Sequence, residues 1–298
     1  MASTGDIKRR IRSVTNTRKI TKAMELVAAT KMRRAVKSVL DTRSYATRAW
    51  SVIRSLAVNV DRQSHPLLRV SKKDKRIALI VIASNRGLCG GHNREIVETA
   101  LEFAKSKQGD EVVTDAVIMG KHARSVGAKN RVNVIAEFPK EDVAAGVQEI
   151  TAVAKLLTKE FVAGTYDGVY IAYADYYSAL KQEPRVRQIL PIREEDAALG
   201  SVKGEKDHEA IGATEYLFEP TPNAVLEYVL YRVIEVQIYQ ALLESNASEH
   251  SARMIAMRNA SDAASDMIDD LTLTFNQARQ AAITTEIADI AGGKAALE

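Results

Sequence analysis

The spacing of hydrophobic residues predicts a very long helix at the start of the chain. Between Gly5 and Pro66 no glycine or proline interrupts the sequence, and apolar residues recur in steps of mostly three and four. This periodicity predicts one helix of roughly 50 residues, about 75 Å long. So long a helix is typical of a coiled coil or a projecting shaft. The expected buried positions are Ile7, Ile11, Val14, Ile20, Met24, Val27, Met32, Ala35 and Val39.

The C-terminal end of the chain shows the same pattern. No glycine or proline occurs between Asn223 and Ala291, so Thr221-Pro222 is the expected start of a second long helix and Gly292-Gly293 its expected stop. Two long terminal helices favour an antiparallel pair, with an ordinary helical bundle as the open alternative. The expected seam is Met257, Ala260, Ala264, Met267, Leu271, Thr274, Ala278 and Ala281, flanked by Ile268, Phe275 and Ala282.

The middle of the chain alternates between strand and helix patterns. Strands are expected at 77–84, 112–120, 131–139, 167–176, 186–192 and 213–220, and helices at 94–107, 121–127 and 140–164. Alternation of this kind predicts a parallel, Rossmann-like sheet, with the late strands pairing at its edge. The charged, glycine-spotted segment 193–212 is expected to be a surface loop.

These patterns predict an α/β fold class in which a long antiparallel coiled coil of the N- and C-terminal helices carries an inserted Rossmann-like α/β domain. The expected boundaries are 1–60 for the N-terminal helix, 61–76 for a linker, 77–220 for the α/β domain and 221–298 for the C-terminal helix.

The stretch SNRGLCGGHN, residues 84–93, follows the first strand and raises the question of a phosphate-binding turn. Its glycines fit neither the dinucleotide pattern G-x-G-x-x-G nor the P-loop pattern G-x-x-x-x-G-K-[ST]. We therefore interpret it as a tight turn whose glycines allow positive φ. Arg86, at the carboxyl end of the strand, is a candidate for a partner surface.

No other catalytic or metal-binding pattern emerges. The five histidines share no ligand spacing with Cys89 or with paired carboxylates, and G-x-S-x-G is absent. His250 is interpreted as a surface or interface residue, and Cys89 as a small buried residue rather than a nucleophile. We expect no catalytic residue, no metal and no cofactor. A single cysteine excludes an internal disulfide and fits a reducing compartment.

Charge is distributed unevenly. Residues 1–60 hold 14 Lys and Arg against three acids, a net charge of +11 in a chain whose total is +4, so the remainder carries −7. An acidic partner is expected for this segment. No apolar stretch is long enough to cross a bilayer, and the N-terminus lacks the apolar core of a secretory signal.

Four ordered motifs together resemble the gamma subunit of the bacterial F-type rotary ATP synthase. They are IRSVTNTRKITKAMELVAATKMRRA (11–35), SNRGLCGGHN (84–93), EVQIYQALLESNASEHSARMIAMRNAS (235–261) and RQAAITTEIADIAGG (279–293). The resemblance implies a non-catalytic central-stalk rotor that couples ion-driven rotation of the membrane c ring to conformational cycling of the beta subunits. It also implies one copy per three alpha-beta pairs, contact with the epsilon subunit and the c ring, and a peripheral position on the cytoplasmic face of the plasma membrane.

The resemblance further implies which residues contact beta and alpha. They are Lys22, Met24, Lys31, Arg33, Arg34, Arg253, Arg279, Gln280, Thr284 and Glu286, while Ile283, Ile287 and Ile290 resemble a shaft tip that turns within an apolar sleeve. One departure concerns Asn85, where the family is expected to have Asp. The competing hypotheses are a basic coiled coil that binds nucleic acid and a nucleotide-dependent enzyme built on the α/β insert.

Overall fold

A computed structural model describes residues 4–57, 65–69, 74–108, 112–129, 132–143, 146–192, 219 and 221–295. The expected loop 193–212 lies outside the described residues, as does almost all of the expected strand 213–220. The chain forms two compact units, one of residues 1–28 and 254–298 and the other of residues 29–253. Each unit is described by itself.

Two helices account for the chain ends, as predicted. Helix α1 spans Thr4–Ala57 and helix α4 spans Pro222–Ala295, with lengths of 54 and 74 residues. Thr221 caps α4, because its Oγ1 accepts a hydrogen bond from the backbone N–H of Ala224 at 3.3 Å. The predicted stop at Gly292-Gly293 was wrong, since the helix continues to Ala295. A glycine ends a helix only where it takes the left-handed conformation, and here the helical conformation continues through both.

In the first unit the helices pair in antiparallel fashion, which confirms the prediction. Thr21 Oγ1 lies 2.7 Å from Ser261 Oγ, and Arg18 donates to Ser265 Oγ at 3.4 Å. The residue number on α1 falls from 21 to 18 while that of its partner on α4 rises from 261 to 265, so the two helices run in opposite directions.

The seam between these helices differs from the predicted one. On α4 it passes from Ala264 to Ile268 rather than to Met267, which is 52% exposed. On α1 the predicted Ile20 and Val27 are 61% and 56% exposed. Polar side chains take their places in the seam, and a pattern built on apolar residues alone misses them. The buried or half-buried positions include Ile7, Ile11, Val14, Arg18, Thr21, Glu25 and Ala28 on α1, and Met254, Met257, Ala260, Ser261, Ala264, Ile268, Leu271, Phe275 and Ala278 on α4.

The second unit is built on a five-stranded sheet. Its strands are β1 (Arg76–Ile82), β2 (Val113–Met119), β3 (Asn133–Phe138), β4 (Gly168–Tyr176) and β5 (Gln182–Leu190), in the order β3-β2-β1-β4-β5. The first four strands pair in parallel, and β5 is antiparallel to β4 at the edge. The predicted parallel sheet with a late edge strand is therefore confirmed.

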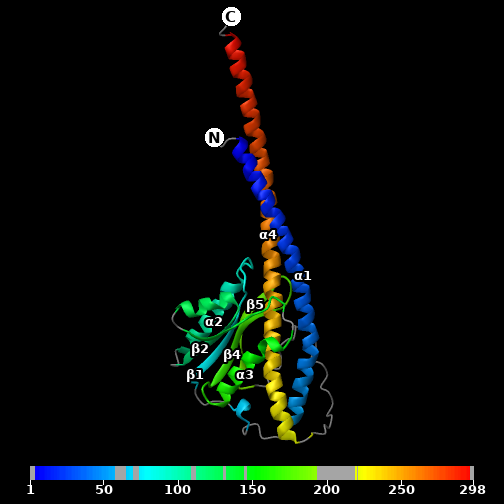
Figure 1. The fold of residues 1–298 in the computed structure, drawn as a ribbon, viewed down its shortest axis with the longest axis vertical. Coiled ribbons are helices and arrows are strands. Elements are labelled where there is room, and N and C mark those ends of the chain that lie inside the picture. Colours follow the sequence, from blue (N-terminus) through cyan, green and yellow to red (C-terminus); the bar gives the residue numbers. More distant parts are fainter. Residues whose placement is uncertain are drawn as a thin grey trace. The chain divides into compact units, whose positions relative to one another are not determined.

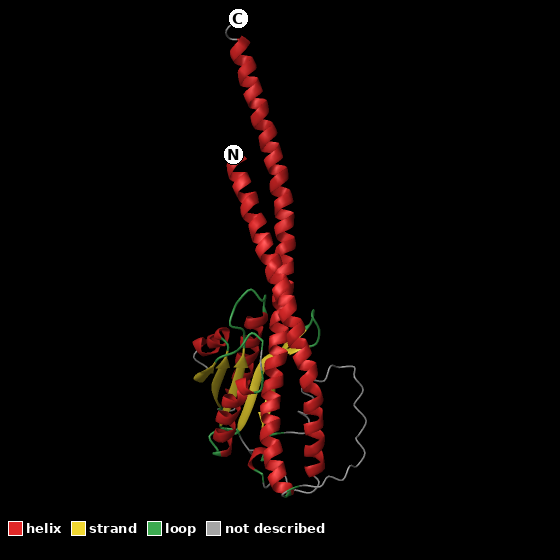
Figure 2. Ribbon diagram, turned by 45° about the vertical axis from the view of Figure 1, so that its right-hand side comes forward, coloured by secondary structure: helices red, strands yellow, loops and turns green. Residues whose placement is uncertain are grey.

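Helices cover both faces of the sheet (Figures 1 and 2). Alternate residues of β1 point to opposite sides, so Ala78 and Ile80 belong to one buried cluster and Leu79 and Val81 to the other. Helix α2 (His92–Gln108) and the 3-10 helix η3 (Lys121–Lys129) cover one face. Helix α3 (Gln148–Val162), the short η2 (Pro66–Leu68) and the first part of α4 cover the other.

Helix α3 begins later than predicted. The sequence pattern predicted a helix from residue 140, but the helix starts at Gln148. The residues before it are bonded to α4 instead: Lys140 by its side chain, and Glu141 and Asp142 by their carbonyl oxygens. These contacts hold the backbone outside a helix.

Candidate functional site

The residues that the resemblance singled out fall in both units. Lys22, Met24, Arg279, Gln280, Thr284 and Glu286 belong to the first unit, and Lys31, Arg33, Arg34, Arg86 and Arg253 belong to the second. Each unit brings together only its own members of this set.

In the first unit an ion cluster crosses the helix pair at Lys22. Its ammonium lies 2.8 Å from Glu25 Oε2, and Arg258 Nε lies 3.2 Å from Glu25 Oε1. Glu25 is only 5% exposed, whereas the Lys22 side chain is 58% exposed. The hydrogen bond from Lys22 is the main cause that holds the pKa of Glu25 below its ordinary value, with burial opposing it and Arg258 helping. Lys22 therefore reaches both inward to a buried carboxylate and outward to solvent.

Beside this cluster α1 presents an outer face that mixes apolar and cationic groups. Ile20, Leu26 and Val27 are all more than half exposed, and Met24 is half-buried. A shallow groove of about 600 Å³ lies between α1 and α4 next to this face, lined by Arg18, Lys19, Lys22, Ala23, Leu26, Ser261, Asp262 and Ser265. Large apolar side chains gathered on an exposed helix face mark a surface that meets a partner.

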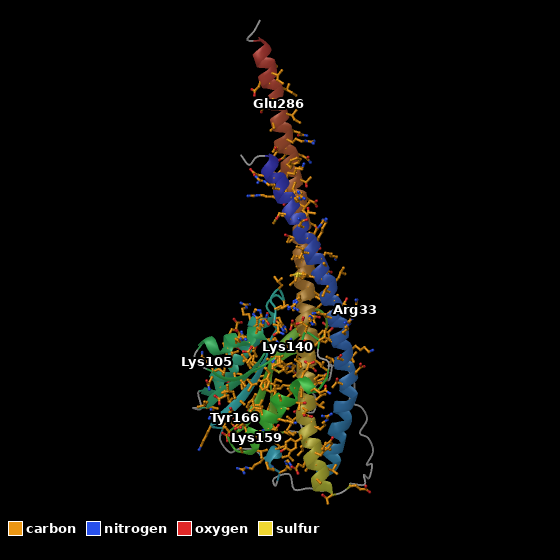
Figure 3. The ribbon with its side chains drawn as sticks, viewed as in Figure 1. Arg33, Lys105, Lys140, Lys159, Tyr166 and Glu286 are labelled. Atoms are coloured by element: carbon orange, nitrogen blue, oxygen red, sulfur yellow. The ribbon has the colours of Figure 1, made fainter. Side chains whose placement is uncertain are left out.

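The end of α4 is exposed all round. Every residue from 279 to 291 is exposed, including Arg279, Gln280 and Glu286 (Figure 3). The Thr284 hydroxyl bonds to the Gln280 carbonyl of its own helix at 2.9 Å. Ile283, Ile287 and Ile290, at helical spacing, are 48%, 62% and 68% exposed. A row of exposed isoleucines on a bare helix calls for an apolar surface to cover it.

The basic residues of α1 in the second unit divide into two kinds. Arg33 and Arg34 are exposed (Figure 3 labels Arg33). Lys31 instead forms an ion pair with Asp142 at 2.6 Å. The hydrogen bond from Lys31 is the main cause that lowers the pKa of Asp142. The charges of Arg33 and Arg34 are thus exposed to solvent, while Lys31 is paired with Asp142 inside its own unit.

Arg253 is also bonded within its own unit. Its side chain is 12% exposed and donates to Glu249 Oε1 at 2.9 Å. The same guanidinium donates to the carbonyl oxygens of Arg86 at 2.9 Å and Gly87 at 3.3 Å. Arg253 therefore ties helix α4 to the turn that follows β1.

Glu249 is the centre of a buried network. Lys140 Nζ lies 2.6 Å from Glu249 Oε2, with side chains only 1% and 2% exposed. Burial alone raises the pKa of Glu249, but the charges of Lys140 and Arg253 outweigh it and bring that pKa down to about 2. Asn246 Nδ2 donates to the Glu141 carbonyl at 3.4 Å. A carboxylate buried this deeply is held in its charged form by two cations.

The surface assignment of His250 was wrong. The residue is 1% exposed, and its Nε2 lies 2.6 Å from the carbonyl oxygen of Asp142. Burial is the main cause that lowers the pKa of His250, and the Asp142 carbonyl and Glu249 oppose it. His250 is thus a buried member of the network between α4 and the segment before α3.

The glycine turn is closed by its own side chains and by the network. Gly90 has a φ of 59°, as expected of a tight turn, and Leu88 has a φ of 63°. Asn85 donates to the Lys140 carbonyl at 2.5 Å and accepts from the backbone N–H of Lys121 at 3.3 Å. Cys89 is buried, as predicted. Asn85 thus joins the turn to the residues beside β2 and before α3.

Sequence reasoning missed Lys140, Asp142, Asn246 and Glu249. A signal existed on α4: Asn246, Glu249, His250 and Arg253 follow the helical spacing i, i+3, i+4, i+7, so they share one face. Polar residues at that spacing in a helix that is buried on all sides indicate a bonded network. Nothing in the local sequence identified Lys140 and Asp142 as their partners.

The described residues contain neither a metal-binding cluster nor a membrane-spanning helix. No group of three or more His, Cys, Asp or Glu side chains in the described part of the chain is placed to hold a metal ion. Within the same residues, no helix has the length and apolar character that crossing a membrane requires.

Comparison with known proteins gives full-length matches. The model of a family described as ATP synthase matches residues 3–297. The ATP synthase gamma chain of Roseiflexus castenholzii is 41% identical over 301 residues, covering 100% of this chain and 99% of the relative. That of Herpetosiphon aurantiacus is 43% identical over 307 residues, with the same coverage.

Solved structures agree in fold. The central stalk and c ring of the Tetrahymena thermophila mitochondrial ATP synthase contains a chain that matches with a TM-score of 0.59 and 26% identity, covering 81% of this chain and 99% of that one. A chain of the Euglena gracilis mitochondrial ATP synthase rotor matches with a TM-score of 0.60 and 19% identity, covering 94% of this chain and 98% of that one. Given these sequence matches along its whole length, the chain belongs to the family of ATP synthase gamma chains.

Proposed function

We propose that the chain is the central-stalk rotor of an ATP synthase, which couples rotation of the c ring to conformational cycling of the beta subunits and is itself non-catalytic. One observation carries this proposal: helix α4 is continuous from a stretch anchored in the α/β unit to a stretch exposed on every side. A continuous helix anchored at one end and bare at the other suits a shaft that transmits torque.

The functions of the proteins with similar structures support this proposal. They are described as a central stalk with its c ring and as a rotor. By analogy we propose that this chain contacts the c ring and the epsilon subunit, and that one copy serves three alpha-beta pairs. We further propose a peripheral position on the cytoplasmic face of a bacterial plasma membrane.

We propose that the exposed side chains of this set make the direct contacts with beta and alpha. Lys22, Met24, Arg33 and Arg34 on α1 present an imperfectly packed, cationic surface, and the bare end of α4 adds Arg279, Gln280, Thr284 and Glu286. Such a surface suits a moving contact, because a deeply buried ion pair with beta would hold the rotor in one position.

Lys31 and Arg253 contribute in a different way under this proposal. Both are bonded within the α/β unit, to Asp142 and to Glu249 respectively, so they position the helices. The exposed Arg86 keeps its side chain available for a partner while its carbonyl accepts from Arg253.

Nucleic-acid binding by the basic segment is the less favoured function. Part of its charge is used within the chain, where Lys22 pairs with Glu25 and Lys31 pairs with Asp142. The family match also points to a protein assembly.

The test is ATP hydrolysis by cognate alpha and beta subunits with and without this chain, with the chain alone as the control. We expect no hydrolysis by the chain alone, assembly at one copy per three alpha-beta pairs, and a marked gain in cooperative turnover. A chain that neither assembles with these subunits nor changes their turnover would contradict the proposal. Charge reversal at Arg33 and Arg34 should then weaken the gain while leaving assembly intact.

A further inference from the structure

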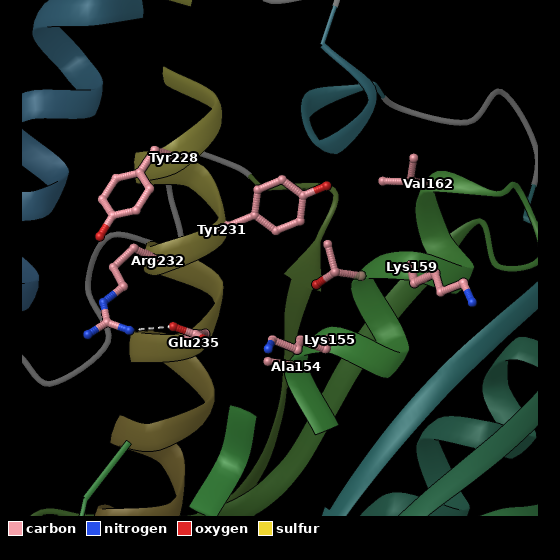
Figure 4. A pocket seen from close by; sticks show the side chains of 9 residues that line it. Ala154, Lys155, Lys159, Val162, Tyr228, Tyr231, Arg232 and Glu235 are labelled. Carbon is pink, nitrogen blue, oxygen red and sulfur yellow. Dashed lines mark hydrogen bonds and ion pairs between the residues drawn. The ribbon is translucent and has the colours of Figure 1, made fainter. Parts of the chain in front are cut away.

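A buried carboxyl group on helix α4 forms no ion pair with any described residue. Earlier on this helix Glu235 pairs with Arg232 at 2.6 Å (Figure 4), and later the buried Glu249 pairs with Lys140 at 2.6 Å. Glu244 lies between them in sequence and is only 2% exposed. A buried carboxylate without a paired cation is costly, so such a group takes up a proton instead.

Glu244 faces the carboxyl group of Asp175, at the end of strand β4. Helix α4 contacts this end directly, because Ser248, one turn beyond Glu244, donates to the Ala174 carbonyl at 3.1 Å. A side-chain hydrogen bond joins Asp175 to Glu244. Two ionised carboxylates are both acceptors, so a hydrogen bond between them requires that one of them carries a proton.

The surroundings of the two carboxyl groups show which one holds the proton. Gln240 donates to Glu244 Oε1 at 3.1 Å, whereas Oε2 has no hydrogen-bond partner among the residues that the structure describes. Asp175 is less deeply buried, with its side chain 15% exposed, and it pairs with Arg185 at 3.0 Å. Because Asp175 has a cation in direct contact and Glu244 has none, the proton resides on Glu244.

Other charged and titratable groups reach this pair from the same face of strands β4 and β5. They are Tyr173 of β4 and Glu183, Arg185 and Arg187 of β5. Burial is the main cause that raises the pKa of Glu244 to about 8, and Asp175 adds to it, whereas Gln240 and Arg187 act in the opposite sense. Burial also raises the pKa of Tyr173 well above its ordinary value, so that phenol stays neutral. Glu183 is bound to Lys181 at 2.8 Å.

We propose that Glu244 and Asp175 form a proton-bound joint that holds helix α4 against strands β4 and β5, and that loss of the proton opens this joint. Deprotonation releases the proton to water and leaves two carboxylates facing each other in a buried site, where like charges repel. The joint is a property of the chain by itself and does not depend on the rotor function.

The first experiment detects the proton itself. Infrared spectra of the full chain with isotopically labelled glutamate separate a protonated glutamate carboxyl group from the ionised ones. We expect the protonated band at pH 7, where solvated carboxyl groups are ionised, and its loss as the pH rises past the pKa of Glu244 at about 8. Glu244→Gln should abolish the band. The matched control Glu227→Gln, at an exposed site of the same helix, should retain it. Absence of the band at pH 7, or its survival in Glu244→Gln, overturns the proposal.

A further variant tests the part played by Asp175. In Asp175→Asn the carboxylate is replaced by an amide, whose N–H groups can donate to an ionised Glu244. The protonated band should then disappear at a lower pH than in the unsubstituted chain. An unchanged midpoint contradicts the pairing of the two carboxyl groups.

Labelling of a buried thiol tests whether the joint opens. Ser248→Cys places a thiol one turn from Glu244 at a fully buried position. Between pH 7 and pH 9 its labelling, corrected for thiol ionisation, should become about tenfold faster, because opening is linked to deprotonation of Glu244, whose pKa is about 8. Adding Glu244→Gln should remove this increase, since a glutamine amide donates to Asp175 without a titratable proton.

The native Cys89 serves as the internal reference, because it is buried in the turn after β1. At pH 9 the thiol introduced at position 248 should be labelled faster than Cys89, since the joint opens while the rest of the unit stays folded. Equal labelling of the two thiols would show unfolding of the whole unit and overturn the proposal. An increase that persists when Glu244→Gln is present overturns it as well.

Discussion

Two stretches of helix α4 share one backbone and have opposite surroundings. Every residue from 236 to 251 is buried, and every residue from 279 to 291 is exposed. Hydrophobicity does not follow that division: the buried stretch contains Gln237, Glu244 and Glu249, while the exposed stretch contains Ile283 and Ile287. Glu249 pairs with Lys140 and Arg253, and Glu244 accepts a hydrogen bond from Gln240, whereas the buried amide of Gln237 has no hydrogen-bond partner among the described residues. The exposed apolar groups are covered by none of the described residues of their own unit, and such exposure is typical of a surface that binds another protein.

The largest difference between the buried and exposed stretches of α4 is expected when one charge is removed from the buried stretch. In Glu249→Leu, the Lys140 side chain, which is only 1% exposed, loses the carboxylate with which it pairs. We expect the free energy of unfolding to fall by about 3–5 kcal/mol, because the stranded cation has lost its main counter-charge. Urea unfolding followed by circular dichroism measures this loss.

The matched control removes the other charge too. Lys140→Met/Glu249→Leu should recover most of the lost stability, since neither side chain then carries a charge. If the single variant is as stable as the unsubstituted chain, the ion pair is not the element that holds this part of α4.

Overpacking the buried stretch should have the next largest effect. Ser248 is fully buried and donates to the Ala174 carbonyl at 3.1 Å, so the helix lies close to the end of β4. Ser248→Leu should lower the free energy of unfolding by about 1–3 kcal/mol. Thr284→Leu, at the exposed end, should change it by less than about 0.5 kcal/mol. Equal costs at the two positions would remove the distinction between the stretches.

The buried groups also predict how stability changes with acid. Burial is the main cause that lowers the pKa of His92 to about 4, so folding favours its neutral form and stability declines as pH falls from 6.5 toward 4. The lowered pKa of Glu249, about 2, adds a decline as pH falls below 4.5. His250, whose pKa is also lowered, and Glu244, whose raised pKa acts in the opposite sense, titrate across the first window as well, so the comparison is with a variant. As the pH falls from 6.5 toward 4, the unfolding free energy of His92→Gln should decline less than that of the unsubstituted chain.

A buried carboxyl group acts in the opposite sense as the pH rises from 4.5 toward 8. Burial, with help from Asp175, raises the pKa of Glu244 to about 8, so its contribution is present below 4.5 and is lost as pH rises toward 8. Glu244→Gln should flatten this part of the profile. A profile that keeps its slope between pH 4.5 and 8 in the variant would assign this decline to another group.

The smallest effect on stability is expected at the bare end. Ile283→Ser/Ile287→Ser should change the unfolding free energy of the isolated chain by less than about 0.5 kcal/mol, because both side chains are about half exposed or more. In the assembled enzyme the same variant should weaken the coupling between ATP hydrolysis and ion pumping. Loss of stability in the isolated chain would show instead that these isoleucines pack within it.

The long helices and the sheet were predictable because each depends on local periodicity. The helix between Gly5 and Pro66 and the alternation of strands and helices follow from patterns spanning a few residues. The seam register was only partly predictable, since Thr21, Glu25 and Ser261 fill it by bonding across the pair. No apolar pattern contains those positions.

The polar network was the least predictable part of the candidate site. Lys140 and Glu249 are 109 residues apart in sequence, and Asp142 and His250 are 108 apart. Each of these residues is of a polar or charged type that usually lies on a solvated surface. Only the fold, which brings the segment before α3 against α4, turns them into buried partners.

The continuity of α4 has a consequence for how its bare end stays ordered. Starting a helix is unfavourable because several residues must be fixed for one hydrogen bond, whereas extending it adds one bond for each residue fixed. The buried stretch 236–251 supplies that start, so residues 279–291 are helical by extension from it. Amide hydrogen exchange should therefore be slow in the buried stretch and grow faster toward Ala295, as an end that frays and re-forms. A peptide of residues 279–291 alone, deprived of this start, should be largely unfolded in water.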